Sequence, residues 1–411
     1  MVILYYILLI ISLIYGLYFA ATGLWAFVRK QKQTAPSETE YKNRFAVIIA
    51  ARNEAGVIGN LIDSIKAQNY DKDRVTVYTA VNNCTDNTEF VAKMHGSEII
   101  SCPNTVRSKG DVLKRVFAEY GTHEDIDAFV IFDADNIVHP DYLKHINHAI
   151  NEGALVMQCK RDTKNLSDNW ISAGYSLFYY IQNFFFNRAR DRVGLSGSIN
   201  GTGFAVTRKA LSITGFDTHT MTEDIEYTAI CALHNVRIKY VEEAVTYDEQ
   251  PTGFGDSVRQ RKRWSKGNLQ CFLRYLGRLF AAFFKTGNIS CLDMGFNFAA
   301  PAMTIVTVVS TAMLMAFSLF GVRLNDILSY VFAYGWLFMA LTYLSGIVVA
   351  SLILKINGHR AEECTSGVLL FTLFLLTWLP INISVLFSRN TNWVPIKHTK
   401  NVSIENLLEK N

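Results

Sequence analysis

Charged residues are scarce in this sequence. Only 18% of its 411 residues are Asp, Glu, Lys or Arg, whereas 50% are hydrophobic. This balance excludes an ordinary water-soluble enzyme and predicts that part of the chain lies in lipid. The formal net charge is only +4, and the sequence lacks the dense Lys/Arg blocks that follow a nucleic-acid backbone. We therefore expect no nucleic-acid partner.

The sequence also lacks Cys-x-x-Cys pairs and the cysteine spacing of small secreted domains. These absences argue against a disulfide framework and against a zinc site, and they favour reduced thiols that face a cytosol. We interpret the seven cysteines as packing residues: Cys84, Cys102, Cys159, Cys231, Cys271, Cys291 and Cys364.

Charge is absent altogether from residues 2–28. A bilayer core about 30 Å thick needs roughly 20 apolar residues of helix, so this run predicts a transmembrane helix. It has no basic n-region and no convincing small-residue cleavage site, which indicates a retained helix instead of a signal peptide. Arg29, Lys30 and Lys32 follow it. The positive-inside rule then places a linker, residues 29–44, and the domain behind it in the cytosol.

The region over residues 291–388 contains three further runs without charge, Met294–Val322, Ile327–Leu354 and Cys364–Ser388. Each run is long enough to cross a bilayer. The third contains Pro380 and has two alternatives. It either crosses fully, which puts the tail at 389–411 outside, or it is re-entrant or interfacial, which returns the tail to the cytosol. The sequence leaves both open.

Two stretches have the composition of helices that lie in the headgroup layer. Residues 170–192 carry many aromatic residues ahead of three arginines, and residues 269–290 mix Phe and Leu with basic residues. Aromatic bodies with cationic rims are typical of interfacial helices. The alternative for each stretch is a buried helix of the soluble domain.

Residues 45–268 alternate short apolar runs with amphipathic ones. This pattern predicts an α/β domain with a largely parallel, Rossmann-like sheet. Strands are predicted at Phe45–Ala50, Val75–Val81 and Ala128–Phe132, and helices at Val57–Ala67 and Lys109–Tyr120. In such a sheet ligands bind beyond the carboxyl ends of the strands.

Polar clusters follow the ends of all three predicted strands. They are Ala51-Arg52-Asn53-Glu54, Asn82-Asn83-Cys84-Thr85-Asp86 and Asp133-Ala134-Asp135-Asn136. Turn chemistry or helix capping is an alternative explanation for each cluster alone. Their shared location predicts a nucleotide site.

Asp133 and Asp135 give the most specific chemical prediction of these clusters. Two carboxylates one residue apart, on a loop that leaves a buried strand, supply hard oxygen ligands to Mg²⁺ or Mn²⁺. Such an ion bridges protein oxygens to substrate phosphates and neutralises a departing diphosphate. An Asp-x-Asp pair by itself also matches calcium loops and ordinary turns.

Asp224 follows Thr222 and Glu223 and lies downstream of a glycine-rich segment, Asn200-Gly201-Thr202-Gly203. A carboxylate that opens the helix predicted over Ile225–Leu233 lies at the positive end of the helix dipole. There it is ionised and able to accept a proton from a sugar hydroxyl. The alternative, that Thr222 or Asp224 is an N-cap, is compatible with this role.

Gln260, Arg261, Arg263 and Trp264 combine an amide, two planar cations and an aromatic face. Guanidinium groups pair with phosphate oxygens, and a Trp face stacks on the apolar side of a pyranose ring. We expect Arg263 to hold a leaving diphosphate and Trp264 to form the floor of an acceptor subsite. The alternative is an interfacial helix whose Arg and Trp side chains anchor to headgroups.

The ordered set of Asp133-Ala134-Asp135, Thr222-Glu223-Asp224 and Gln260-x-x-Arg263-Trp264 resembles the motifs of the membrane-integrated family-2 glycosyltransferases. This group includes cellulose, chitin, hyaluronan and poly-N-acetylglucosamine synthases. The resemblance covers about residues 45–290 by motif and the rest by the arrangement of helices. It implies a GT-A fold between transmembrane helices of a multi-pass cell-membrane protein. It also implies a cytosolic catalytic domain that inverts the anomeric carbon of a nucleotide-sugar, which we expect to be a UDP-sugar.

The resemblance also assigns roles to residues by their position in the motifs. It implies a catalytic base at Asp224 and metal ligands at Asp133 and Asp135. It implies donor-binding roles for Ala51, Asn53, Glu54, Asn82, Lys109, Asp133, Gln260, Arg261 and Arg263. It implies acceptor-binding roles for Gly201, Thr202, Gly203, Glu223 and Trp264.

Two positions depart from the family pattern. The family usually has Asp where Asn82 stands, and Asn keeps a carbonyl acceptor but loses the charge. The segment Asn392–His398 resembles the Trp-containing gating segment that follows the membrane region in these synthases, with His398 where Arg is common.

Three functions fit these motifs. The first is a processive synthase that extends a β-linked polysaccharide and exports it, with an accessory membrane subunit or a homo-oligomer completing the path. The second is transfer of a single sugar to a lipid, as in ceramide glucosyltransferases, which resemble the same motif set. The sequence contains only about four membrane segments, and a polymer channel within one subunit needs more. The third is a catalytically silent scaffold of an envelope-polysaccharide complex.

Overall fold

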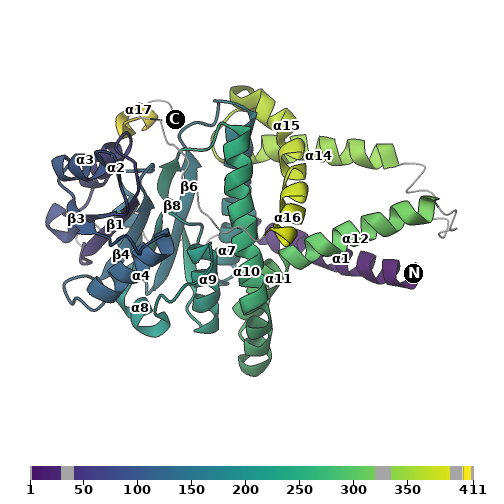
Figure 1. Ribbon diagram of the computed structural model, residues 1–411, viewed down its shortest axis with the longest axis horizontal. Coiled ribbons are helices and arrows are strands. Elements are labelled where there is room, and N and C mark those ends of the chain that lie inside the picture. Colours follow the sequence, from purple (N-terminus) through teal and green to yellow (C-terminus); the bar gives the residue numbers. More distant parts are fainter. Residues whose placement is uncertain (1, 29–40, 320–334, 389–399, 401, 409–411) are drawn as a thin grey trace.

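A central β-sheet organises the α/β domain (Figure 1). The computed structural model describes residues 2–28, 41–319, 335–388, 400 and 402–408, and within them the sheet has eight strands in the order β3-β2-β1-β4-β7-β6-β8-β5. The pairs β3/β2, β2/β1, β1/β4 and β6/β8 are parallel, whereas β7 is antiparallel to β4 and β6, and β5 is antiparallel to β8. The strands are β1 (Phe45–Ala51), β2 (Val75–Val81), β3 (Glu98–Ser101), β4 (Ala128–Asp133), β5 (Ile137–Val138), β6 (Val156–Thr163), β7 (Phe204–Thr207) and β8 (Ile238–Asp248).

The three predicted strands are confirmed. β1 and β4 each extend by the first residue of the polar cluster that follows, Ala51 and Asp133. Both strands are buried along almost their whole length, because helices cover both faces of the sheet. A strand buried on both faces has a continuous apolar sequence in place of a polar and apolar alternation.

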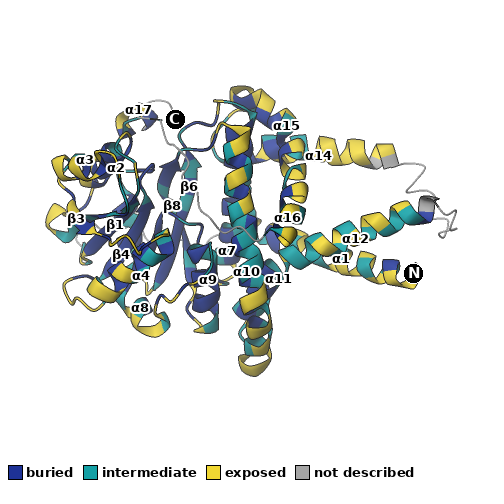
Figure 2. Ribbon diagram, viewed as in Figure 1, coloured by how far each residue is buried: buried dark blue, intermediate teal, exposed yellow. Residues whose placement is uncertain are grey.

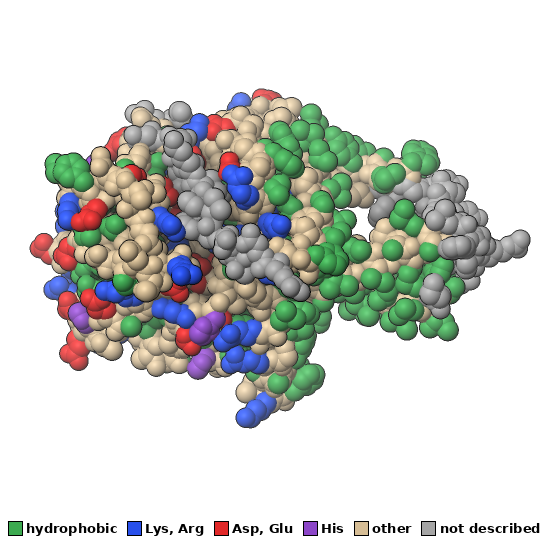
Figure 3. Space-filling view, in the orientation of Figure 1, with side chains coloured by type: hydrophobic (Ala, Val, Ile, Leu, Met, Phe, Trp, Pro, Cys, Tyr) green, Lys and Arg blue, Asp and Glu red, His purple; other side chains and the backbone are tan. Residues whose placement is uncertain are grey.

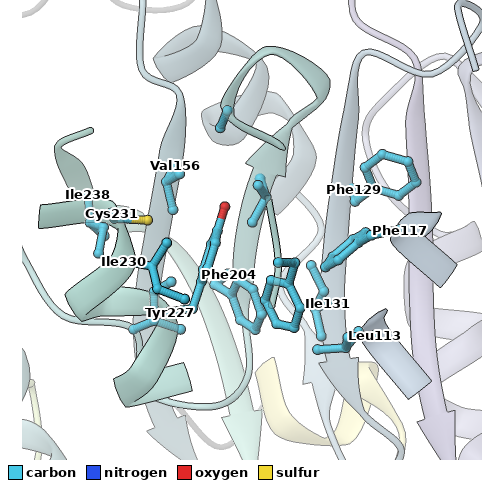
Figure 4. Packing of buried hydrophobic residues seen from close by; sticks show 14 of the residues in the cluster. Leu113, Phe117, Phe129, Ile131, Val156, Phe204, Tyr227, Ile230, Cys231 and Ile238 are labelled. Atoms are coloured by element: carbon cyan, nitrogen blue, oxygen red, sulfur yellow. The ribbon is translucent and has the colours of Figure 1, made fainter. Parts of the chain in front are cut away.

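Two layers of helices cover the sheet. One face packs against α4 (Lys109–Tyr120) and α9 (Glu223–Leu233), and the other against α2 (Ile58–Lys66) and α5 (Tyr142–Asn151). Figure 4 shows Phe117 of α4 beside Phe129 of β4, and Tyr227 of α9 on the same side of the sheet near Phe204 of β7. Burying such a ring contributes roughly 1.5–3 kcal/mol. This packing fixes the amino-terminal ends of α4 and α9 at the edge where β1 and β4 end.

The longest helix, α10, runs without a break from Phe254 to Thr286 and ends at Gly287, whose φ of 72° is a left-handed helix cap. It passes through the predicted boundary between residues 268 and 269, so the Gln260–Trp264 motif and the 269–285 segment share one helix. α10 packs on α9, on α11 (Ile289–Phe298) and on α16 (Trp378–Phe387). It therefore joins the catalytic motifs to the apolar helices.

Four helical segments are long and apolar enough to cross a membrane, judged by length and composition among the described residues: Val2–Phe27, Ala300–Phe317, Met339–Ile356 and Ala361–Phe387. Helices α1 (Val2–Gly23), α12 (Ala300–Leu319) and α14 (Gly335–Ile356) extend away from the sheet in Figure 1. Figure 2 shows that their outer surfaces are exposed, and Figure 3 that hydrophobic side chains cover them, while charged side chains gather over the α/β domain.

The fourth segment has a different course. It consists of η5 (Ala361–Cys364), α15 (Thr365–Leu376) and α16, with Pro380 in the first turn of α16, where the missing N–H costs little. α16 runs alongside α10 in Figure 1, across the direction of α1, α12 and α14.

The tail returns to the α/β domain. The backbone N–H of Lys400 donates to Glu249 Oε2 at 2.9 Å, and the Lys400 ammonium lies 2.9 Å from a carboxylate oxygen of Asp168. Ile404 of α17 (Ile404–Leu408) packs with Ile137 of β5. The proposed gating segment, Asn392–His398, lies outside the described residues.

Residues 170–192 form α6 (Trp170–Ile181), a π-helical turn η4 (Gln182–Arg188) and α7 (Ala189–Arg192). α6 packs between β6 and the helices α14 and α15, and Tyr175 and Tyr180 are fully buried. The buried-helix alternative therefore holds for α6. The remaining elements are η1 (Leu24–Phe27), η3 (Lys72–Arg74), α3 (Thr88–Met94) and α8 (Arg208–Thr214).

Candidate active site

The loops after β1 and β2 are joined to each other. The N–H of Asn82 donates to the carbonyl of Ala51 at 3.0 Å, and the N–H of Glu54 donates to Thr88 Oγ1 at 2.8 Å. Asn53 has a φ of 59° and accepts a hydrogen bond from the Thr85 N–H at 2.7 Å through Oδ1. Asn tolerates this left-handed conformation better than most residues, since its short side chain bonds locally. The predicted nucleotide loops therefore form one connected edge.

Lys109 joins two of the predicted motifs. Its ammonium donates to Asp133 Oδ1 at 2.5 Å and to the Gly201 carbonyl at 2.7 Å. The position of Lys109 is fixed because Ser108 caps α4 and accepts from the Asp111 N–H at 3.1 Å. The Asp-x-Asp loop, the start of α4 and the glycine-rich segment thus meet at one cation.

Asp224 lies beside the same group. A Cβ atom added to Gly201 would be 3.3 Å from Asp224 Oδ2, and Gly201 has a φ of 86°. Glycine is favoured at such an angle, and its lack of a side chain allows the carboxylate to come close. The structure therefore brings Asp224, Gly201, Lys109 and Asp133 into one contiguous set.

Glu223 and Asp224 are adjacent carboxyl groups, and the pKa of each is raised. Burial, and then the charge of Asp224, raises the pKa of Glu223 to about 7. Burial also raises the pKa of Asp224, and the cations Arg263 and Lys109 oppose that rise. Carboxyl groups whose pKa is shifted by burial and by a charged neighbour are typical of catalytic sites.

α10 is held to the Thr222-Glu223-Asp224 loop. Arg263 Nη1 donates to the Met221 carbonyl at 3.3 Å, and the Met221 N–H donates to Gln270 Oε1 at 2.9 Å. At Gly267 an added Cβ would lie 2.3 Å from Thr222 Oγ1, so only glycine permits this approach of helix and loop. Arg263 is therefore placed near the carboxylate pair, as its electrostatic effect on both groups also shows.

Trp264 lies in a cluster of aromatic rings. Its ring centroid is 5.8 Å from Tyr175, 6.1 Å from Tyr179 and 6.3 Å from Trp378 of α16, with an interplanar angle of 24° to Trp378. Tyr179 also faces Arg161, whose guanidinium carbon is 3.9 Å from the Tyr179 ring centroid. The aromatic cluster thus extends from the active-site loops to the apolar helix α16.

A buried ion pair supports the site and was not predicted. Arg161 Nε donates to Asp248 Oδ2 at 2.6 Å, and its Nη1 donates to the Asn200 carbonyl. Burial raises the pKa of Asp248 to about 7 against the lowering effect of Arg161, and the charge of Asp135 adds to the rise. Asp248 ends strand β8, so the rule that polar clusters follow strand ends, applied to this strand, would have found it.

Asp133 and Asp135 provide the oxygen ligands that a divalent cation prefers. Asp135 is buried, and its Oδ2 accepts from the Glu249 N–H at 3.2 Å. Within the described residues no three His, Cys, Asp or Glu side chains are grouped so as to hold a metal ion. The carboxylates of Asp133 and Asp135 are of the ligand type that Mg²⁺ or Mn²⁺ takes.

Three predicted residues are placed differently from the expectation. Arg261 is fully buried, and its Nη1 donates to Thr377 Oγ1 at 2.6 Å, so it points to the α15–α16 junction and away from the carboxylate group. Thr202 is buried beneath the Asp-x-Asp loop, because its Oγ1 accepts from the Asp133 N–H at 2.9 Å. Gly203 has a φ of 59°, and an added Cβ would lie 2.2 Å from Cys159 Sγ, so its role there is packing.

Residues 43–267 match the family described as Glycosyltransferase like family 2, and the chain belongs to this family. The expectations of a glycosyltransferase domain and of a GT-A type α/β fold are confirmed.

The individual proteins that this chain resembles share low sequence identity with it. The chain is 25% identical over 251 residues to a probable glycosyltransferase, YdaM, of Bacillus subtilis, covering 58% of each chain. It is 25% identical over 250 residues to a beta-monoglucosyldiacylglycerol synthase of Synechocystis, covering 59% of this chain and 51% of that one. The match thus spans only about half of each relative. The solved mannosyltransferase PcManGT of Pyrobaculum calidifontis, in complex with GDP-Man and Mn²⁺, superposes with a TM-score of 0.62 at 16% identity. That superposition covers 94% of this chain and 99% of the mannosyltransferase, and it shows the shared fold.

Proposed function

We propose that this protein transfers one sugar from a UDP-sugar to a membrane lipid. The observation that carries the proposal is the stacking of Trp264, in the predicted acceptor subsite, on Trp378, the first residue of the apolar helix α16. The predicted acceptor subsite would therefore adjoin the apolar helices. Relatives named beta-monoglucosyldiacylglycerol synthase, 25% and 26% identical, support the same substrate class.

The number of apolar helices favours lipid transfer over polymer export, because the described residues contain four candidate membrane spans. α12 packs against α1, whereas α14 packs against α6 and α15. A polysaccharide channel needs helices that close around a path, and a lipid acceptor needs only lateral access. On this proposal no accessory subunit is required to complete a pore.

The donor would bind at the edge formed by the loops after β1, β2 and β4. Lys109 and Arg263 both oppose the raised pKa of the carboxyl pair, and they would face the diphosphate. Asp133 and Asp135 would hold Mg²⁺ or Mn²⁺, which when bound offsets the negative charge of the leaving diphosphate. Ala51, Asn53 and Asn82 would contact the nucleoside.

Transfer would then proceed by a single displacement. The acceptor hydroxyl gives its proton to the Asp224 carboxylate, and its oxygen bonds to the anomeric carbon of the sugar. The bond from that carbon to the diphosphate oxygen breaks with its electron pair, and UDP leaves with the charge held by Lys109 and Arg263. Attack from the face opposite the leaving group inverts the anomeric carbon.

We also propose the membrane topology. If α1 ends in the cytosol, α12 leads out and α14 leads back, and the tail then lies on the cytosolic side, where Lys400 contacts Glu249. A fourth crossing by α15 and α16 would put the tail on the opposite side from the domain it contacts. The α15–α16 segment is therefore assigned to the interface.

The test uses the full-length protein in nanodiscs that contain dioleoylglycerol, with radiolabelled UDP-glucose and Mn²⁺. The expected product is a lipid with one hexose, identified by mass spectrometry. Label in a polymer that stays at the origin of a thin-layer plate would support the processive alternative and contradict the proposal. No transfer by a protein that still binds UDP would support the silent-scaffold alternative.

A further inference from the structure

Two buried hydrogen-bond donors at the contact of α10 and α16 have no partner in the described part of the chain. They are Arg261 Nη2 and the indole Nε1 of Trp378. Nearly all buried donors in folded proteins are paired, and an unpaired one costs roughly 1–3 kcal/mol. Two such donors in one place indicate a missing acceptor.

The surroundings of Arg261 are aromatic. Its guanidinium carbon lies 4.6 Å from the Phe374 ring centroid and 5.5 Å from that of Trp378, and Nη1 donates to Thr377 Oγ1. The side chain is fully buried, and the described residues provide it with no carboxylate partner. The ring faces offset part of its charge, so Nη2 is available to a neutral oxygen acceptor.

The position of these donors connects the lipid to the catalytic carboxylate. On one side the Trp378 ring stacks on Trp264, which contacts Tyr179. Tyr179 faces Arg161, which donates to the carbonyl of Asn200, the neighbour of Gly201. On the other side α16 exposes apolar residues, among them Phe387, which is 82% exposed. The Trp378 ring thus lies between the apolar helix α16 and the Trp264–Tyr179 ring pair.

Building on the proposed function, we propose that Arg261 and Trp378 form the subsite for the glycerol esters of a neutral glycerolipid acceptor. Nη2 and Nε1 donate to ester carbonyl oxygens and hold the lipid so that its free hydroxyl extends toward Asp224. Both donors are closed off from solvent, so entry of the lipid separates the Trp378 ring from Trp264. A phosphate group carries negative charge and would need cations in addition to Arg261, the cation that contacts the Phe374 and Trp378 rings.

The test replaces Trp378 by Phe, which keeps a ring but removes the N–H. The full-length variant in nanodiscs should show a KM for dioleoylglycerol, as mole fraction, that is about fivefold to tenfold higher, the effect of losing one hydrogen bond. The dissociation constant for UDP, measured by calorimetry, should stay within about twofold. Trp336→Phe is the matched control, because Trp336 is 65% exposed on α14.

The outcomes separate this inference from the proposed function. If wild type glucosylates dioleoylglycerol and Trp378→Phe has the same acceptor KM as Trp336→Phe, the subsite is refuted while the function stands. If wild type transfers no sugar to dioleoylglycerol, the function itself fails and the subsite with it. A preference of wild type for phosphatidylglycerol over dioleoylglycerol would overturn the neutral assignment. Arg261→Gln should raise the acceptor KM in the same way, and Trp378→Phe alone decides if that variant does not fold.

Discussion

Replacing Glu223 by Gln should stabilise the protein at alkaline pH. Burial, and then the charge of Asp224, raises the pKa of Glu223 from 4.5 to about 7, which corresponds to roughly 3 kcal/mol. Because the folded protein binds this proton more tightly than the unfolded chain, the contribution is fully present below pH 4.5. It is lost as the pH rises through about 7. Gln has nearly the shape of the neutral carboxyl group but does not ionise. The variant therefore does not lose this stability as the pH rises.

The assay is thermal unfolding of the detergent-solubilised full-length protein at pH 5.5 and pH 8.5. For a domain of this size about 3 kcal/mol corresponds to a Tm difference of roughly 5–10 °C. Glu223→Gln should exceed wild type by that full amount at pH 8.5 and by less than half of it at pH 5.5, which lies one unit above the ordinary pKa of 4.5. Glu119→Gln is the control, since the Glu119 side chain is 50% exposed. A parallel loss of stability with pH in Glu223→Gln and wild type would refute the reasoning.

Three further substitutions test separate parts of the site. Asp135→Ala should weaken Mn²⁺-dependent UDP binding at least about tenfold in calorimetry, and unchanged affinity would remove Asp135 from the metal site. Gly203→Ala should lower the free energy of unfolding by about 1–3 kcal/mol, because its Cβ would lie 2.2 Å from Cys159 Sγ; wild-type thermal stability would contradict this packing. Trp264→Ala should reduce lipid glucosylation more than hydrolysis of UDP-glucose, and equal losses would assign Trp264 to packing.

Most of the fold could be predicted from the sequence because its local signals agree. β1 and β4 are continuous apolar runs that end at polar clusters, as buried parallel strands do. α4 begins at Lys109 because Ser108 and Asp111 form a capping box, which the sequence itself displays. The convergence of the loops after β1, β2 and β4 followed from one rule, that loops at the carboxyl ends of parallel strands meet at one edge. The place of Asp224 beside them was implied by the family resemblance.

The direction of individual side chains was harder to predict. Arg261 and Arg263 are two positions apart on α10, and residues at that spacing lie on different faces of a helix. Only Arg263 can therefore face the carboxylates, and Arg261 packs against α15 and α16. The family resemblance implied an acceptor role for Thr202, but its hydroxyl accepts a hydrogen bond from the backbone N–H of Asp133.

Long-range pairings gave no local signal. The Arg161–Asp248 pair joins β6 to the end of β8, and the local sequence of neither strand indicates that these two residues pair. The return of the tail was open in the sequence, because loop charge alone does not distinguish a crossing from an interfacial helix. The contact of Lys400 with Glu249 depends on where α16 ends in space.

The rate of Asp224→Asn tests the central claim most directly, that Asp224 removes the acceptor proton at a site built around Asp133 and Lys109. Single-turnover glucosylation of dioleoylglycerol should fall by about 10²–10⁴-fold, the usual worth of a general base, while the dissociation constant for UDP stays within about twofold. A rate close to wild type, with UDP binding intact, would contradict the account.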